Sequence, residues 1–331
     1  MSRRTEALID RPEGRRVDVL EEMLAALRLS GGVFVESVFS APWSVASHIG
    51  PEDCAQFFPV PRQLIAYHYV REGAMTCVVG DTIVEVAQGE IVLIPQNIPH
   101  LLHGGARPWP RPINAREMLA HIDADGILRL RGGGGGEATL LYCGYLGTNT
   151  TDNLLLESLP AALVIGPDAV RGERLARSLD FAAQEVATHS PEMVGKLAEV
   201  LFAEAVRRYV ASLDMDARGW LAGLRDPAVG RALIRIHGRY AENWTLEALA
   251  REAGVSKTVL AERFRALIGD SPMQYCARWR MRVAAEMLRD DRQNAASVAY
   301  SVGFNSEAAF SRAFKREFGT PPATWAREAV A

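Results

Sequence analysis

The stretch SVAYSVGFNSEAAFSRAFKREFGTPP, residues 297–322, decides the fold of the C-terminal third of this 331-residue chain. It holds a short segment of small and apolar residues, a turn with Gly303, a second segment and a Gly-x-Pro stop. In the second segment, phenylalanines recur every four residues, which is the spacing of one helix face. Two helices joined by a glycine-containing turn form a helix-turn-helix, so the stretch predicts such a unit.

An earlier stretch, TLEALAREAGVSKTVLAERFRALIGDSP over residues 245–272, repeats the same order of parts with Gly254 in the turn. Apolar residues at helical spacing mark the inward face of the second helix in each unit: Leu260, Phe264 and Leu267 in the first, and Phe310, Phe314 and Phe318 in the second. The segment between the units, residues 271–291, predicts one long helix that separates them. The C-terminal part is therefore expected to hold two helix-turn-helix units.

Helix starts are marked by hydroxyl residues. Thr245, Ser256 and Ser306 each stand where a side-chain oxygen can accept hydrogen bonds from the free N–H groups of a helix beginning there. The second helix of each unit is then expected to begin just after Ser256 or Ser306 and to point its first turn outward.

The outward faces of these two helices carry the candidate DNA contacts, because first-turn residues reach base edges and longer basic side chains neutralise phosphates. They are Ser256, Lys257, Thr258, Ala261, Glu262, Arg265, Asn305, Ser306, Glu307, Ser311, Arg312 and Lys315. Glu262 has two readings. It could accept a hydrogen bond from a cytosine amino group, or it could pair with Arg263 or Arg265 on the helix surface, which is the favoured reading.

Charge divides along the same boundary. Residues 227–331 contain 16 lysines and arginines against 11 acidic residues, whereas residues 1–226 contain 21 against 29. A basic segment joined to an acidic one is typical of a nucleic-acid-binding module fused to a module without that role. A structural nucleoid protein would be far more basic than this chain.

The segment from Ala228 to about Arg327 resembles the DNA-binding domain of the AraC/XylS family of regulators. The resemblance is carried by Gly303, Phe304, Ser306, Phe310, Arg312, Phe314, Lys315, Gly319, Pro322 and Trp325. It implies seven helices, with the two recognition helices in successive major grooves of double-stranded DNA, about 34 Å apart. It also implies activation through contact with RNA polymerase, although repression would use the same geometry.

Residues 33–165 predict short β-strands at 64–73, 74–80, 82–89, 90–95 and 138–146, each rich in β-forming residues and ended by turn formers. This spacing is typical of a barrel or sandwich. The glycine run at 132–136 is expected to be a loop between strands.

The N-terminal part, over roughly residues 17–227, resembles the cupin barrel of one branch of these regulators. GEIVLIPQNIPH carries Gly89, Pro95 and His100 of the second cupin motif, with Asn97 where the pattern usually has glycine. Near the first motif, His68 is followed by Tyr69 and Val70, so the His-x-His pair is missing.

The barrel has two candidate contents. A transition metal such as zinc would be bound by His68, His100, His103 and Cys143, since imidazole and thiolate are its preferred ligands. If no metal is bound, His68 and Cys143 simply pack as buried residues. The second candidate, a small-molecule effector in an apolar pocket, is the favoured one.

Residues 167–226 predict two amphipathic helices, at 170–187 and 193–213, the second with Met193, Leu197, Val200, Leu201 and Val206 on its apolar face. They could form a dimer seam or pack on the barrel. Residues 220–227 are expected to be a linker before a helix that starts with proline.

Together these patterns predict an α+β multidomain protein: a cupin-like sensor barrel at 1–166, a helical segment at 167–226 and a double helix-turn-helix at 227–331. No apolar run is long enough to span a membrane and the four cysteines form no CxxC pair, so a cytoplasmic location with reduced thiols is expected. The function predicted is that of an effector-controlled, homodimeric transcription regulator and not an enzyme, with no catalytic residues. The alternative is a metal-dependent cupin enzyme fused to a DNA-binding domain.

Overall fold

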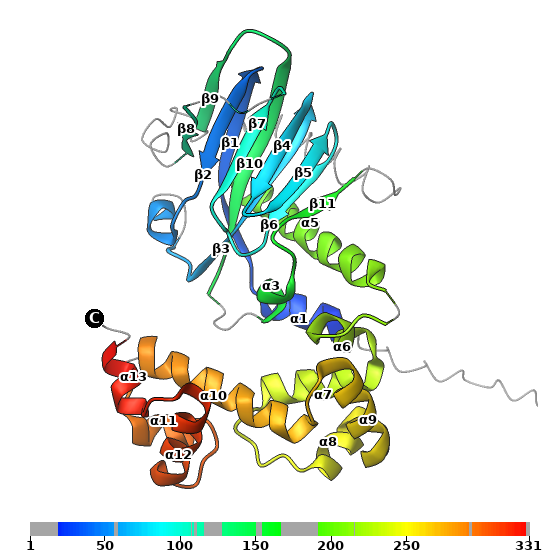
Figure 1. Cartoon of the computed structure of the whole chain (residues 1–331), viewed down its shortest axis with the longest axis vertical. Coiled ribbons are helices and arrows are strands. Elements are labelled where there is room, and N and C mark those ends of the chain that lie inside the picture. Colours follow the sequence, from blue (N-terminus) through cyan, green and yellow to red (C-terminus); the bar gives the residue numbers. More distant parts are fainter. Residues whose placement is uncertain are drawn as a thin grey trace, which may run out of the picture.

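The computed structural model describes residues 19–55, 59–106, 108, 111–115, 128–149, 154–166, 191–214, 216–290 and 293–328. The helix predicted at 170–187 lies outside these ranges. Two β-sheets form the N-terminal part, and a layer of helices from residue 220 onward lies below them in Figure 1. The expected α+β fold class is confirmed, with a β-rich N-terminal part and a helical C-terminal part. No helix in the described ranges combines the length and apolarity needed to cross a membrane.

The strands form two separate sheets in the part of the chain that the structure describes. One has the order β11-β6-β3-β10-β1-β9 and the other the order β5-β4-β7-β2-β8. Their bounds are β1 Ser30–Ser40, β2 Trp43–Ser47, β3 Gln63–Glu72, β4 Ala74–Val79, β5 Thr82–Ala87, β6 Ile91–Ile94, β7 His100–Gly104, β8 Ile113–Asn114, β9 Leu128–Gly133, β10 Ala138–Thr148 and β11 Leu163–Ile165. A short 3-10 turn, Pro51–Cys54, follows β2. All the strands predicted from sequence are present.

The central strand β3 is buried on both faces, which explains its nearly continuous apolar sequence. Leu64 and Ala66 face the second sheet in one apolar cluster, and the alternate residues Ile65 and Tyr67 belong to another cluster on the opposite face. The two sheets are thus packed face to face, with an interior between them.

Helix α5, Pro191–Ser212, packs against the outer face of the six-stranded sheet, whereas α1 Val19–Ala26 and α3 Leu154–Ser158 lie between the sheets and the C-terminal helices, next to α6 and α7 (Figure 1). In α5, Phe202 and Val206 are fully buried in the cluster that contains this face of the sheet. The second predicted helix therefore packs on its own sensor domain. Val200 was placed on the apolar face by the sequence pattern, and this was wrong, because its side chain is 51% exposed.

Seven helices follow from Pro227 within the described residues, as the family resemblance implied. They are α7 Pro227–Gly238, α8 Leu246–Ala253, α9 Lys257–Ile268, α10 Pro272–Asp290, α11 Ala295–Ser301, α12 Glu307–Phe318 and α13 Pro322–Glu328. The predicted long helix between the units is α10.

The linker predicted at 220–227 was partly wrong, because a further helix, α6, occupies Trp220–Arg225. Five of its six residues are buried, so it packs as part of the core. The proline start was right: Asp226 caps α7 by accepting hydrogen bonds from the backbone N–H groups of Ala228 and Val229, both at 2.9 Å.

Candidate nucleic-acid interface and sensor cavity

The two predicted recognition helices, α9 and α12, are built alike. Ser256 accepts a hydrogen bond from the backbone N–H of Val259, and Ser306 accepts one from that of Ala309, each at 3.3 Å. Each helix ends at a glycine in the left-handed conformation. Thr245 caps the preceding helix α8 in the same way, at 3.1 Å from the N–H of Ala248. The three predicted caps are therefore confirmed.

The apolar face of each recognition helix is buried. Phe264 in α9 and Phe310 and Phe314 in α12 are fully buried, so the opposite faces are turned to solvent. Of the twelve predicted DNA contacts, Ala261 and Ser311 are half-buried and all the others are exposed. Both helices can thus present their polar faces to a groove.

Charges on these faces are arranged differently in the two units. In the first, Lys257 forms an ion pair with Glu247 at 2.5 Å, and Arg263 pairs with Asp226 at 3.2 Å. Within the described ranges, Glu262 makes no ion pair with Arg263 or Arg265, so the structure does not show the surface pairing favoured for it.

In the second unit, Arg312 and Lys315 of α12 are exposed and form no ion pair with any residue that the structure describes. Their positive charges are therefore available to an external anion. In Figure 1, α12 lies on the side of α10 away from the sensor sheets.

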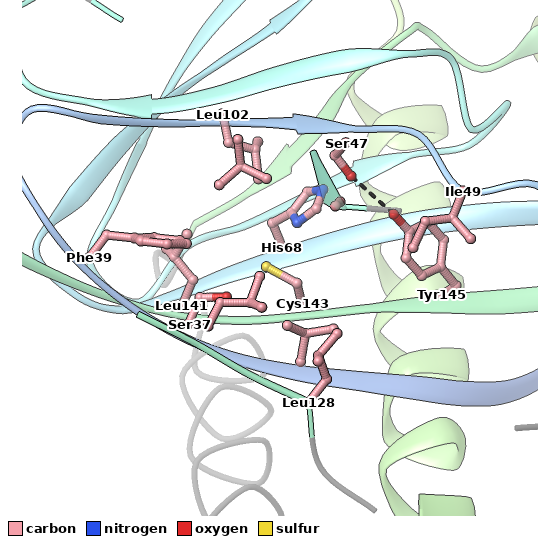
Figure 2. A pocket seen from close by; sticks show the side chains of 14 residues that line it. Ser37, Phe39, Ser47, Ile49, His68, Leu102, Leu128, Leu141, Cys143 and Tyr145 are labelled. Carbon is pink, nitrogen blue, oxygen red and sulfur yellow. Dashed lines mark hydrogen bonds between the residues drawn. The ribbon is translucent and has the colours of Figure 1, made fainter. Parts of the chain in front are cut away.

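A partly open cavity lies between the two sheets of the sensor domain, and the centres of water-sized spheres can occupy about 30 Å³ of it (Figure 2). Its wall is mostly apolar, with a few polar groups and no lysine, arginine, aspartate or glutamate among the lining residues. These are Val35, Ser37, Phe39, Val45, Ser47, Ile49, His68, Leu102, Ala115, Leu128, Leu130, Leu141, Cys143 and Tyr145. A mostly apolar lining with a few polar groups is typical of small-molecule sites.

His68 is the most polar ring in the wall and is joined to His100. Their Nε2 atoms are 2.7 Å apart, and the Nδ1 of His100 is 2.7 Å from the backbone carbonyl oxygen of Ile98. Burial holds the pKa of His68 well below its usual value, and burial likewise lowers the pKa of His100 to about 4. Both rings are therefore neutral near pH 7.

The other polar groups of the wall are neutral as well. The hydroxyl groups of Ser47 and Tyr145 form a hydrogen bond of 3.0 Å, and Figure 2 shows it at one end of the cavity. Burial raises the pKa of the Cys143 thiol and of the Tyr145 hydroxyl. The wall thus offers hydrogen-bonding groups without a charge.

The four predicted metal ligands do not converge. Cys143 lies opposite His68 across the β10–β3 pair, and His100 touches His68. His103 is three residues beyond His100 on the same strand, so it faces the opposite side of the sheet. No group of three or more histidine, cysteine or acidic residues that could hold a metal is present in the described part of the chain. The residues present do not fit a zinc centre, because such a centre needs at least three protein ligands.

Sequence reasoning missed Ser47 and Tyr145. They are 98 residues apart in the chain and meet only because β2 and β10 belong to facing sheets. Nothing local in the sequence reveals that pairing. The spacing of His100 and His103, in contrast, was a usable signal that the two rings would separate.

Two family models match the chain. One, described as a cupin, matches residues 18–211, and the other, described as a helix-turn-helix domain, matches residues 249–328. Their bounds agree with the sheet-containing part and the helical part of the structure.

Several named relatives match over most of the chain. An AraC-like transcription regulator of Streptomyces lividans is 32% identical, with 92% of this chain and 97% of the relative covered. The HTH-type transcriptional regulator AlkR of Acinetobacter baylyi is 28% identical over 80% of this chain and 89% of its own. The RCS-specific HTH-type transcriptional activator RclR of Escherichia coli is 26% identical over 95% and 98%, respectively.

Proposed function

Since this chain belongs to the family of AraC-like, DNA-binding transcription regulators, we propose that a small molecule bound between its sensor sheets controls how its two recognition helices bind DNA. The observation that carries this proposal is the mostly apolar cavity between the sheets, which has no charged side chain among its lining residues. The proposed outcome of effector binding is activation of transcription.

The packing between the two parts supports the coupling. One apolar cluster includes Tyr67 and Leu93 of the sensor sheet and also Leu233 and Phe264 of the first helix-turn-helix unit. The first helix-turn-helix unit therefore shares a hydrophobic core with the sensor. An effector that favours one packing of this core over another would shift the unit between two positions, which is the requirement for control by a ligand.

Polar contacts follow the same path. After β6, the side-chain amide of Gln96 donates hydrogen bonds to the carbonyl oxygens of Leu156 and Leu159, at 2.5 and 2.8 Å, and so holds α3. From α3, Glu157 accepts a hydrogen bond from Arg282 of α10 at 2.7 Å. A chain of hydrogen bonds thus links the sensor sheet to α10, the helix that joins the two helix-turn-helix units.

Three further parts of the proposal concern partners, location and chemistry. We assign RNA polymerase as the partner in activation and a second copy of the chain as the partner on DNA, both from the family resemblance. The work of such a regulator is in the cytoplasm, where the DNA lies. We propose no enzymatic activity, because a metal-dependent cupin enzyme needs a ligand set with an open position, which His68 and His100 alone do not provide.

The DNA-binding part is tested by selecting bound fragments from sheared genomic DNA and then measuring affinity over a range of salt concentrations. We expect one enriched motif with half-sites about 10 base pairs apart. Replacement of Arg312 by alanine should reduce the slope of log affinity against log salt by about 0.9, because one phosphate contact is lost. Lys196→Ala is the matched control, because it removes one exposed positive charge from the sensor helix α5.

An unchanged salt slope for Arg312→Ala would place Arg312 outside the interface.

Effector control and its direction are tested with a reporter gene behind the selected promoter. We expect the full chain to raise expression only when effector is present. We expect Leu128→Trp, which fills the cavity, to abolish the response while leaving affinity for DNA measurable. A response that survives filling of the cavity would contradict the proposed effector site.

A further inference from the structure

The hydrogen bonds around the cavity define which ring nitrogen of His68 carries the proton. A backbone carbonyl oxygen can only accept, so the contact between Ile98 and His100 places a hydrogen on the Nδ1 of His100. A neutral imidazole carries one N–H, and the Nε2 of His100 is therefore an acceptor. It follows that His68 donates through its own Nε2 across the 2.7 Å contact.

The other nitrogen of His68 is then a bare acceptor. His68 is only 2% exposed, and its Nδ1 has no hydrogen-bond partner among the residues that the structure describes. Its ring borders the cavity, and Figure 2 shows one ring nitrogen on the side of Cys143. A buried acceptor without a partner is unfavourable, so a ligand that donates a hydrogen bond to it gains affinity.

The Ser47 and Tyr145 pair supplies the complementary group. Whichever hydroxyl donates in their 3.0 Å contact, the proton of the accepting hydroxyl remains available for a ligand. The cavity thus presents one bare acceptor and one available donor in a wall that is otherwise mostly apolar and uncharged. A carboxylate would bring a negative charge with no cation to balance it, and an ether or ketone would leave the His68 acceptor unpaired.

We propose that the effector of this sensor is a neutral, mainly apolar alcohol or phenol, whose hydroxyl group donates to the Nδ1 of His68 and accepts from the Ser47 and Tyr145 pair. This inference rests on the proposed function, since it names the chemical class that the sensor cavity binds. His100 acts as a positioning residue, because its contact with Ile98 fixes the tautomer of His68.

The first test is calorimetric titration of the full chain with four compounds of similar size: 4-ethylphenol, 4-ethylanisole, ethylbenzene and 4-ethylbenzoate. We expect 4-ethylphenol to bind about tenfold more tightly than 4-ethylanisole, which keeps the oxygen but lacks the donor. The tenfold preference should disappear in His68→Leu. His103→Leu is the matched control, because His103 is also buried with an unpartnered Nδ1 but does not line the cavity, and it should keep the preference.

The second test needs no ligand. Nitrogen-15 NMR of the wild-type imidazoles at pH 7 shows which ring nitrogen carries the proton. We expect His68 to be protonated on Nε2 and His100 on Nδ1, and we expect His100→Leu to release His68 from this single tautomer.

Equal affinities for the four compounds, a preference for 4-ethylbenzoate, no binding by any of them, or a His68 protonated on Nδ1 would each overturn the proposal. Neither measurement uses DNA. If the chain failed to bind DNA, the proposed function would fail while the preference for a hydroxyl group could still be measured.

Discussion

The two helix-turn-helix units have the same parts but different surroundings. Each recognition helix begins at a capping serine and ends at a left-handed glycine. The first unit, however, buries Phe264 in the apolar cluster that also contains the sensor sheet, whereas the second buries Phe310 in a cluster of its own. Among the described residues, the first unit therefore packs in the same cluster as the sensor sheet and the second does not. The second unit is joined to the first through α10, which contributes residues to both clusters.

The largest expected effect comes from removing one phenylalanine from each cluster. Phe264→Ala and Phe310→Ala should each lower the free energy of unfolding by about 3–5 kcal/mol, because both side chains are fully buried. The two substitutions should destabilise different sets of helices. Hydrogen exchange followed by mass spectrometry should show faster exchange in α11–α13 alone for Phe310→Ala, and in α8, α9 and α3 for Phe264→Ala. Faster exchange in α3 for Phe310→Ala would refute the separation of the two clusters.

A second comparison uses the turn glycines, which both have positive φ, 73° at Gly254 and 83° at Gly303. A β-carbon at Gly303 would lie 2.3 Å from the backbone oxygen of Ala241, whereas one at Gly254 would make only an ordinary van der Waals contact with Arg231, at 3.5 Å. The backbone beside Ala241 is held, because Arg280 donates hydrogen bonds to the carbonyl oxygens of the residues on either side.

We therefore expect Gly303→Ala to destabilise the protein by about 3 kcal/mol and Gly254→Ala by about 1 kcal/mol, the latter from the left-handed backbone alone. Urea unfolding of the two variants measures the difference. Equal losses would mean that the contact between the second turn and the residues after α7 is not tight.

A third comparison concerns how the stability of each unit depends on pH. His237 of α7 stacks on Trp279 at 4.0 Å between ring centroids and shares a hydrogen bond of 2.8 Å with the Tyr275 hydroxyl, and burial lowers its pKa to about 3. The unfolded chain, with the usual pKa of 6.5, binds a proton there that the folded chain does not. Stability of the first unit therefore falls as pH drops below 6.5, by about 2 kcal/mol between pH 7 and pH 5.

No histidine follows His237 in the sequence, so the second unit lacks this dependence. His237→Phe keeps an aromatic ring against Trp279 and should flatten the profile of unfolding free energy against pH by that amount. The histidines of the sensor stay the same in both proteins and cancel in the comparison. Parallel profiles for the two proteins would show that His237 is accessible to protons in the folded state.

The smallest expected effect is at the ion pair between Glu157 and Arg282, whose side chains are 46% and 36% exposed. Partly exposed ion pairs contribute less than about 1 kcal/mol. A double-mutant cycle with Glu157→Gln and Arg282→Gln should give a coupling energy below that value. A larger coupling would make this pair, and not the shared apolar cluster, the main link between sensor and reader.

How far the sequence predicts the structure depends on how local the deciding interactions are. The helix-turn-helix units were predicted closely, because caps such as Ser256 and Ser306 and the four-residue spacing of the phenylalanines are local signals. Helix α6 was missed because six residues are too few to show a period, and its burial comes from distant partners.

The sensor site was predicted less well for the same reason. Its register brings Tyr145 to Ser47 and Cys143 to His68, and a short apolar strand does not reveal its partner. The grouping of His103 with His100 was the avoidable error, because residues three apart on a strand point to opposite faces.

The length of helix α10 also sets the distance between the two helix-turn-helix units. Its 19 residues extend over about 28 Å at 1.5 Å per residue, and each residue turns the chain by about 100°. Because the second unit follows α10, one inserted residue would both advance that unit and rotate its recognition helix away from the duplex. The separation and relative rotation of the two recognition helices are thus set by the number of residues in α10.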